Sequence, residues 1–463
     1  ESYWEITMST PAALWRKGSL VQSGARARGI ELPWPGLERL EMLGEGGYNE
    51  IFAVGVSAAA TGGHCQGLQL AARVSIEFRR NYFKDPCLAR AFASFPEAPP
   101  VLPVLDARFS GGSAYVLTQR AMSDWDAWSQ ASSTGGPEIA AAHFIVFHQV
   151  LVGIRRMHRL GVAHCDIKPS NVMLKRAAVA SPLSFQAFLI DFDMAAFPGN
   201  RSLGTPEYQP PETLDTNQCG FHTDVWAAGV SLHKVLFRKR PYAFDGDPLY
   251  AGPPLAEVAQ VATGSPDDAG PQPIEAAEVM VESPSDEFEF GSVSDKRQTP
   301  TPTMIREQRW MIEQQRLLTS RRTRASDFAS YLAELEESQG TLRGRISGLW
   351  GPALAADGAA AGPTDAVLRL FTLLFRGDAA QREEALDEAI AIAEIVANHS
   401  ARVINATWPV TGEADGAAAA QWRECAKWVE SNDTQPLPAG AFQIAFVPGG
   451  LQAAHAVSYC LSA

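Results

Sequence analysis

The sequence lacks any uninterrupted run of about 18 apolar residues, the length that a membrane-spanning helix needs. Its longest apolar stretch, His143–Ile154, is broken by histidine and glutamine and is typical of a helix in a protein core. We therefore expect no membrane span. Because the chain begins at Glu1 rather than at methionine, we expect that an N-terminal piece is missing, and the compartment stays unassigned.

Closely spaced cysteines are also lacking. The six cysteines are scattered without a CxxC pair, which argues against a zinc site. In a chain of 463 residues they do not indicate a disulfide framework, so we expect reduced, structural thiols.

Positively charged residues are fewer than negatively charged ones: the formal net charge is −13, and such a surface repels phosphate backbones. Nucleic acid is therefore not an expected partner.

The first 36 residues are predicted to be an N-terminal extension. Trp4, Trp15 and Trp34 stand there among Pro, Gly and Arg. Because tryptophan is costly to expose, we expect this arm to pack on the body of the protein.

The rest of the chain is predicted to form a main domain at residues 37–336 and a C-terminal helical extension at residues 337–463. The main domain divides into a first lobe at 37–120 and a second lobe at 121–336. Within the second lobe, residues 247–303 are acidic, rich in proline and without apolar periodicity, which predicts a mostly disordered insert. The extension is expected to pack on the main domain or on a partner through amphipathic helices at Thr364–Arg376, Gln381–Asn405 and Gly416–Glu430.

Four motifs predict the chemistry. The strongest is His164–Asn171, which reads HCDIKPSN. Phosphoryl transfer needs an aspartate that takes a hydroxyl proton, a lysine that steadies the migrating phosphate and an asparagine that holds a metal ion, and this loop has all three. It is followed by Leu189–Asp193, a strand that delivers an aspartate, then by Gly204–Glu212 and Asp224–Gly229. Four motifs in this order leave little room for coincidence.

These motifs resemble those of the eukaryotic protein kinases of the Ser/Thr type, over about 300 residues. The resemblance implies an α+β, bilobal protein-kinase-like fold with a β-rich N-lobe, a helical C-lobe and a C-terminal helical appendage. It places the hinge between the lobes near Gln119–Ala121.

The resemblance also assigns roles. Asp166 looks like the catalytic base and Lys168 like its catalytic partner, while Asn171 and Asp191 look like the metal ligands. ATP and Mg²⁺ are the implied nucleotide and metal. The residues expected to contact the nucleotide are Gly44, Gly46, Arg73, Thr118 and Gln119.

Two more residues match the family in the C-lobe. Glu212 looks like the acid that locks the activation segment to this lobe, and Arg324–Ser326 looks like the late arginine motif. Lys168 and Thr205 match Ser/Thr kinases rather than tyrosine kinases.

One departure from the family concerns the charge that grips the phosphates. The family has a lysine where this chain has Arg73, and no lysine between Lys17 and Lys84 could replace it. A guanidinium is a wide planar fork and an ammonium is a compact point charge, so the two are not interchangeable. The family's partner glutamate cannot be identified either. Asp85 is short and precedes a proline, so the helix that should bear the glutamate is expected to be short or displaced.

Three other positions depart as well. Asn49 stands where the family has the third glycine of its glycine loop, and Asp193 where it has the glycine of Asp-Phe-Gly. Cys165 replaces the arginine that receives an activation-loop phosphate in the family, so control through that contact is not expected.

Three functions stay open. The departures favour a pseudokinase, a scaffold or regulator with residual ATP binding. The complete set of Asp166, Lys168, Asn171 and Asp191 favours an active, atypical Ser/Thr kinase that uses Arg73. A structural subunit of a larger assembly is the third. In each case the expected partner or substrate is a protein.

Overall fold

The computed structural model describes a little more than half of the chain. The described residues are 32–45, 49–75, 84–93, 95, 97–110, 113–132, 136–177, 183–200, 204–242, 341–350, 363–405, 416–431, 442–443, 457 and 460–461. Several predicted features lie outside them, namely Trp4, Trp15, Gly46, the acidic insert at 247–303 and the arginine motif Arg324–Ser326.

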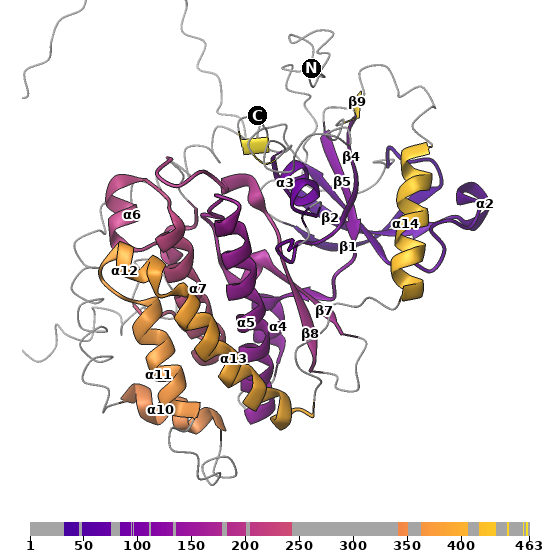
Figure 1. Cartoon of the computed structure of the whole chain (residues 1–463). Coiled ribbons are helices and arrows are strands. Elements are labelled where there is room, and N and C mark those ends of the chain that lie inside the picture. The colour runs from indigo at the N-terminus through magenta and orange to yellow at the C-terminus, as the bar shows by residue number, and fades with distance from the viewer. Residues whose placement is uncertain are drawn as a thin grey trace, which may run out of the picture. The chain divides into compact units, whose positions relative to one another are not determined.

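The first lobe is an antiparallel sheet flanked by helices (Figure 1). Its strands follow the order β1-β2-β3-β5-β4-β9. The predicted hairpin near the start of the chain is β1 and β2, joined across the glycine loop. The elements of this lobe are β1 (Leu37–Glu45), β2 (Asn49–Val56), α2 (Ala58–Thr61), β3 (Leu70–Ser75), α3 (Lys84–Ala93), β4 (Val104–Ser110), β5 (Ser113–Gln119) and β9 (Phe442–Gln443).

The second lobe is helical, with a small sheet of order β6-β7-β8 at its edge. This division into a β-rich and a helical lobe confirms the predicted fold class. Its elements are β6 (Ser123–Asp124), α4 (Trp125–Ala131), α5 (Pro137–Arg159), β7 (Val172–Arg176), β8 (Phe185–Leu189), α6 (Pro211–Thr216), α7 (Phe221–Phe237), α10 (Thr341–Trp350), α11 (Pro363–Leu374), α12 (Ala379–Glu384) and α13 (Leu386–Val403).

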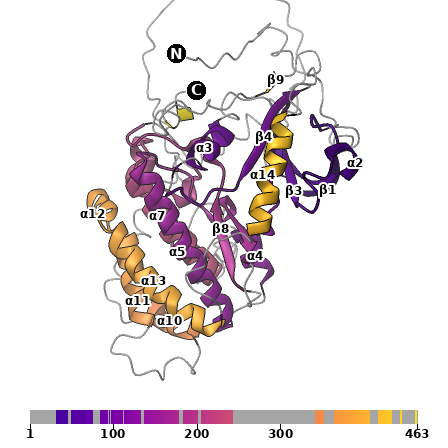
Figure 2. The same ribbon diagram turned by 45° about the vertical axis from the view of Figure 1, so that its right-hand side comes forward.

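Helix α5 is the centre of the helical lobe. By length and composition alone it could cross a membrane, but its apolar side chains are buried against other elements of the lobe. Among its neighbours is α13, which lies along it in both ribbon views (Figures 1 and 2). Leu386, Ala393 and Val396 of α13 belong to the same buried cluster as Ile154 of α5. The first two helices predicted for the extension, α11 and α12–α13, therefore lie in the helical lobe, and α11 and α13 share its core, while the predicted domain bounds stay a prediction.

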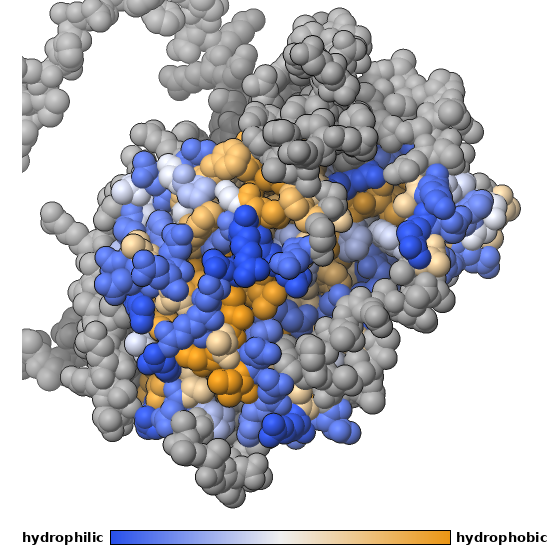
Figure 3. Space-filling view, in the orientation of Figure 1, coloured by the Kyte–Doolittle hydropathy of each residue, from blue (hydrophilic) through white to orange (hydrophobic). Residues whose placement is uncertain are grey.

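One face of the described residues carries both hydrophilic and apolar areas. Figure 3 shows hydrophilic residues over much of this face, with apolar areas between them on the helical lobe. Among the described residues, the large apolar side chains with more than a third of their surface exposed are Leu40, Met42, Leu43, Met122, Phe197 and Ile395.

The cysteines correct the sequence analysis, since the expectation of reduced thiols is wrong. All six pair, as Cys65–Cys425, Cys87–Cys460 and Cys165–Cys219. The first two bonds join cysteines 360 and 373 residues apart, so no local spacing could reveal them. Only the fold brings these cysteines within bonding distance.

The first two disulfides attach the end of the chain to the β-rich lobe. Helix α14 (Gly416–Ser431) lies beside the sheet in Figures 1 and 2. Its Trp428 and Val429 are buried in the same cluster as Leu105 of β4. Further on, Cys460 is bonded to Cys87 of α3.

Trp34 confirms that the end of the N-terminal arm packs on the body. Its ring is buried, and its Nε1 donates to Asp106 Oδ2 at 2.7 Å. The same carboxylate oxygen accepts from Arg108 Nε at 2.8 Å, and Arg108 also donates to the carbonyl of Pro33. A buried charge is tolerated when it is paired and hydrogen-bonded in this way.

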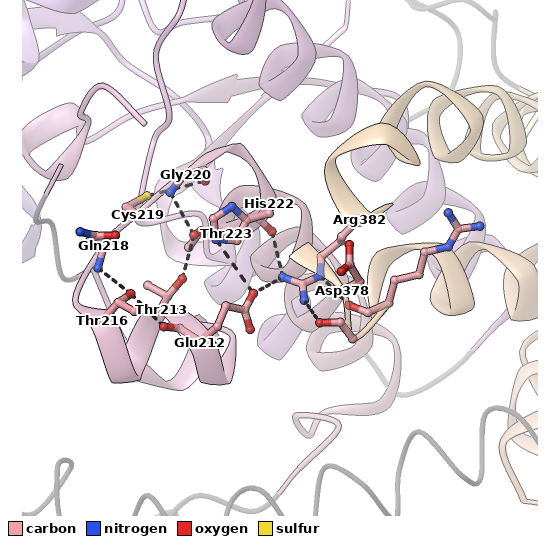
Figure 4. Close-up of polar contacts among 12 residues, drawn as sticks. Glu212, Thr213, Thr216, Gln218, Cys219, Gly220, His222, Thr223, Asp378 and Arg382 are labelled. Atoms are coloured by element: carbon pink, nitrogen blue, oxygen red, sulfur yellow. Dashed lines mark hydrogen bonds and ion pairs between the residues drawn. The ribbon is translucent and has the colours of Figure 1, made fainter. Parts of the chain in front are cut away.

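A second buried arginine holds the activation segment on the helical lobe (Figure 4). Arg382 of α12 is fully buried, and its Nη1 lies 2.6 Å from Glu212 Oε1. Its guanidinium also donates to the carbonyls of Arg376 and Gly377 and lies 4.8 Å from the centroid of the Trp226 ring. Glu212 is thus bonded to the helical lobe through Arg382, a partner that the sequence analysis did not name.

Removal of this arginine is predicted to destabilise the fold. Arg382→Met keeps the apolar bulk against Trp226 but leaves Glu212 and the backbone carbonyls without their donor. We expect the free energy of unfolding to fall by about 3 kcal/mol in chemical denaturation. The matched control is Asp387→Asn, which breaks the exposed pair of Asp387 with Arg155 and should cost under about 1 kcal/mol. Equal losses in the two variants would contradict the anchoring role of Arg382.

Candidate functional site

Arg73 has an acidic partner, which the sequence analysis failed to identify. Arg73 Nη2 on β3 lies 2.5 Å from Asp85 Oδ2 in the first turn of α3, and both side chains are largely buried. The rejection of Asp85 is wrong because Pro86 also lies in that first turn, where a helix needs no N–H donor. Arginine is longer than lysine and aspartate is one methylene shorter than glutamate, so the two changes compensate in length.

Asp85 also holds the segment that follows Asp191, one of the two predicted metal ligands. Its second oxygen, Oδ1, accepts from the backbone N–H of Phe192 at 2.8 Å. The ring of Phe192 packs edge-on against Phe92 of α3, with the centroids 5.4 Å apart. A single carboxylate therefore connects β3, α3 and the residue after Asp191.

The catalytic loop is a tight network around Asp166. Oδ2 of Asp166 accepts from Lys168 Nζ at 2.8 Å and from Asn171 Nδ2 at 3.0 Å. Oδ1 accepts from the backbone N–H of Thr205 at 2.6 Å, and the Thr205 hydroxyl accepts from Lys168 at 2.6 Å. The carboxylate is thus held in one orientation, as a catalytic base must be.

Asp224 of α7 binds the backbone of this loop. Its Oδ2 accepts from the backbone N–H of His164 and its Oδ1 from that of Cys165, both at 2.8 Å. His158 also lies 2.9 Å from Asp224 Oδ2. Asp224 is almost fully buried on α7, so it fixes the loop to the core of the helical lobe.

The predicted metal ligands fit a divalent cation. The amide nitrogen of Asn171 donates to Asp166, which leaves its amide oxygen as the ligand atom. Burial and then the charge of Asp85 raise the pKa of Asp191, against the effect of Arg73, so a cation would relieve this crowding. In the described part of the chain no three His, Cys, Asp or Glu side chains gather as a metal site. Mg²⁺ usually binds one or two carboxylates and completes its shell with phosphates and water.

Asp193 adds a carboxylate to this region. Within the described residues its Oδ1 is buried without a hydrogen-bond partner, and its backbone carbonyl accepts from Lys84 at 3.0 Å. Burial and the charges of Asp85 and Asp191 raise the pKa of Asp193 to about 8. Burial lowers the pKa of Arg73, but the carboxylates of Asp85, Asp193 and Asp191 outweigh it, so the net shift is upward and Arg73 stays charged.

The predicted nucleotide residues lie in the β-rich lobe. Arg73 is opposite Val116 in the β3–β5 pair, and Thr118 is two residues from Val116, so Arg73 and Thr118 point to the same face of the sheet. Gln119 pairs with Leu70 at the end of this ladder. A side-chain carbon added at Gly44, near the end of β1, would meet nothing within 4 Å.

Most residues of this site were identified from the sequence, and their roles stay predictions. The sequence analysis missed the contact of Thr205 with the catalytic base and the support from Asp224, which lie in motifs that it had found. It also rejected Asp85. The available signal was that Asp85 is followed by Pro86, because proline is common in the first turn of a helix.

Comparisons with known proteins agree with this geometry. Residues 114–263 match the family model of the protein kinase domain. The chain contains a eukaryotic protein kinase domain. The kinase domain is similar to the death-associated protein kinase dapk-1 of Caenorhabditis elegans, at 36% identity over 113 residues, which is 23% of this chain and 7% of that protein.

Two other kinases are similar over the same length of chain. Serine/threonine-protein kinase D3 of Homo sapiens is 36% identical over 104 residues, 21% of this chain and 11% of that protein. Serine/threonine-protein kinase nekl-2 of C. elegans is 32% identical over 110 residues, 23% of this chain and 29% of that protein. The match thus spans less than a third of each relative.

The raised pKa of Asp193 predicts a pH-dependent stability of the kinase domain. The folded protein keeps this proton up to about pH 8, whereas the unfolded chain releases it near pH 4. Stability should therefore fall as the pH rises between these values. Relative to Asp193→Asn, the free energy of unfolding of the wild type should drop by up to about 2 kcal/mol from pH 6 to pH 8.

The measurement is chemical denaturation of both proteins at several pH values in this window. Asp387→Asn serves as a control because Asp387 is mostly exposed. A difference between wild type and Asp193→Asn that stays constant with pH would contradict the raised pKa.

Proposed function

We propose that the kinase domain is an active Ser/Thr protein kinase that transfers the terminal phosphoryl group of ATP to a hydroxyl of a protein substrate. It uses Arg73 in place of the usual lysine. The observation that supports this proposal is the pair of Arg73 with Asp85, which restores the ion pair that the sequence had lost. The intact network around Asp166 agrees with it.

Arg73 can serve two partners at once. A guanidinium has five N–H donors in a planar fork, and among the described residues only Nη2 is used, on Asp85. The remaining donors can face a phosphate oxygen, and charge-assisted bonds of this kind are strong. Asp85 holds the fork in place, so Arg73 is positioned before the nucleotide binds.

The catalytic loop supplies the base and a second cation for phosphoryl transfer. Asp166 accepts the proton of the attacking hydroxyl, while Lys168 lies between this carboxylate and the activation segment, where it can steady the moving phosphate. Asn171 and Asp191 would hold Mg²⁺, which supplies charge neutralisation on the phosphates. Thr205 fixes the base by its N–H, so loss of that contact would release Asp166.

A scaffold without phosphoryl transfer is the second candidate, and Asp193 favours it. Its carboxylate adds charge next to Asp191, and the pKa values of both groups are raised. A protonated Asp191 would be a poor ligand for Mg²⁺. The sequence favoured this function, and the pair of Arg73 with Asp85 moves the balance toward the enzyme.

The test replaces Arg73 and Asp85, singly and together, by the lysine and glutamate of the family. Arg73→Lys alone should lower kcat/KM for ATP by about 10- to 100-fold, because the shorter side chain no longer reaches Asp85. Asp85→Glu alone should also lower it, since the longer acid crowds the guanidinium. Arg73→Lys combined with Asp85→Glu should recover activity to within about tenfold of the wild type, measured by phosphate transfer to a Ser/Thr peptide.

Two controls decide between the candidates. Asp166→Ala should abolish transfer, and ATP with Mg²⁺ should raise the Tm of the wild type. If the wild type transfers no phosphate and ATP at millimolar levels leaves Tm unchanged, the kinase proposal fails. Additive losses in the double variant would show that Arg73 and Asp85 do not act as a pair.

We also infer that the chain folds in an oxidising compartment, because disulfides rarely persist in reducing ones. The bonds Cys65–Cys425, Cys87–Cys460 and Cys165–Cys219 leave no free thiol. Alkylation of the denatured, unreduced protein from its natural source should therefore modify no cysteine. Extensive alkylation would contradict the inference.

A further inference from the structure

The residue before the catalytic base is covalently bonded to another part of the helical lobe. Cys165 precedes Asp166 in the chain, and its disulfide partner Cys219 lies in the short loop between α6 and α7. Both cysteines are almost fully buried. The bond is therefore part of the interior of the active-site region.

On the catalytic-loop side, the backbone of Cys165 is held in an unusual conformation. Its φ of 66° lies in the left-handed region, which a residue other than glycine adopts only when its surroundings impose it. Its N–H donates to Asp224 Oδ1 at 2.8 Å, and its carbonyl accepts from Gln209 Nε2 at 2.9 Å. The disulfide is a third restraint on the same residue.

On the other side, Cys219 holds the activation segment. Its carbonyl accepts from the N–H of Gly199 at 2.8 Å, and its own N–H donates to the carbonyl of Asn200 at 3.2 Å. The loop around Cys219 is itself anchored, because Thr223 bonds both Thr213 and the N–H of Gly220 (Figure 4). Cys219 thus connects a fixed loop to the activation segment.

The later part of the activation segment returns to the catalytic loop. Thr205 donates its N–H to Asp166, and Gly204 lies directly on the backbone of Cys165. A side-chain carbon at Gly204 would be only 2.0 Å from the Cys165 carbonyl oxygen. Any shift of Cys165 would therefore displace Gly204 and Thr205, and with them the carboxylate of Asp166.

We propose that Cys165 and Cys219 are positioning residues of the kinase, and that their disulfide holds Asp166 and the activation segment in the arrangement that transfers phosphate. This inference rests on the proposed function. The disulfide is a covalent connection, so it holds the active arrangement without phosphorylation of the activation segment. Its role differs from that of Cys65–Cys425, which joins the β-rich lobe to α14 and belongs to a different buried cluster.

The test compares two double variants, Cys165→Ala with Cys219→Ala and Cys65→Ala with Cys425→Ala. The second pair is a matched control, because it removes a buried disulfide that closes a longer loop and should contribute at least as much stability. Below the Tm of both variants, removal of Cys165–Cys219 should lower kcat by about 10- to 100-fold. The KM for ATP should change by less than about threefold, since Arg73 and the glycine loop lie in the other lobe. The control should keep kcat within about threefold of the wild type.

Hydrogen exchange gives a second readout that needs no activity. The amides of Gly199 and Thr205 should exchange at least about tenfold faster in the Cys165/Cys219 variant and at the wild-type rate in the control. Equal kcat values in the two variants, or unchanged exchange at Gly199 and Thr205, would overturn the proposal. A wild type without phosphoryl transfer would overturn the proposed function, and the exchange rates would then decide alone whether the disulfide positions Thr205.

Discussion

The carboxylate of Asp85 is the interaction on which the candidate site depends. One oxygen bonds the guanidinium of Arg73 and the other bonds the N–H of Phe192. Strand β3, helix α3 and the segment after Asp191 therefore meet at a single group. Because Asp85 is nearly buried, the interaction is stronger than an exposed ion pair of the same length.

This arrangement explains why an arginine can occupy a position that the family gives to lysine. The cation at this position must reach its acidic partner. In this chain both side chains differ in length from the lysine and glutamate of the family. The longer cation meets the shorter acid at 2.5 Å. The excess of carboxylates around it, Asp191 and Asp193, keeps Arg73 charged. The crowding of these carboxylates raises the pKa values of Asp191 and Asp193, and a bound cation would relieve it.

Covalent bonds extend this rigidity beyond the ion pair. Cys87 lies two residues after Asp85, and its bond to Cys460 attaches α3 to the last described segment of the chain. Cys165 lies one residue before Asp166, and its bond attaches the catalytic loop to Cys219. Two of the three disulfides thus adjoin a residue of the site. A buried arginine, Arg382, completes the support of the activation segment through Glu212.

The sequence alone determined the catalytic loop, because Asp166, Lys168 and Asn171 lie within six residues and their order specifies their contacts. It also indicated the two-lobed fold, through the resemblance of its four motifs to those of the protein kinases. Only the tertiary structure decided the partners of Arg73, Glu212 and the cysteines. These contacts join residues 12, 170 and up to 373 positions apart. Contacts at such separations depend on how helices and strands pack together, and local spacing holds no record of that packing.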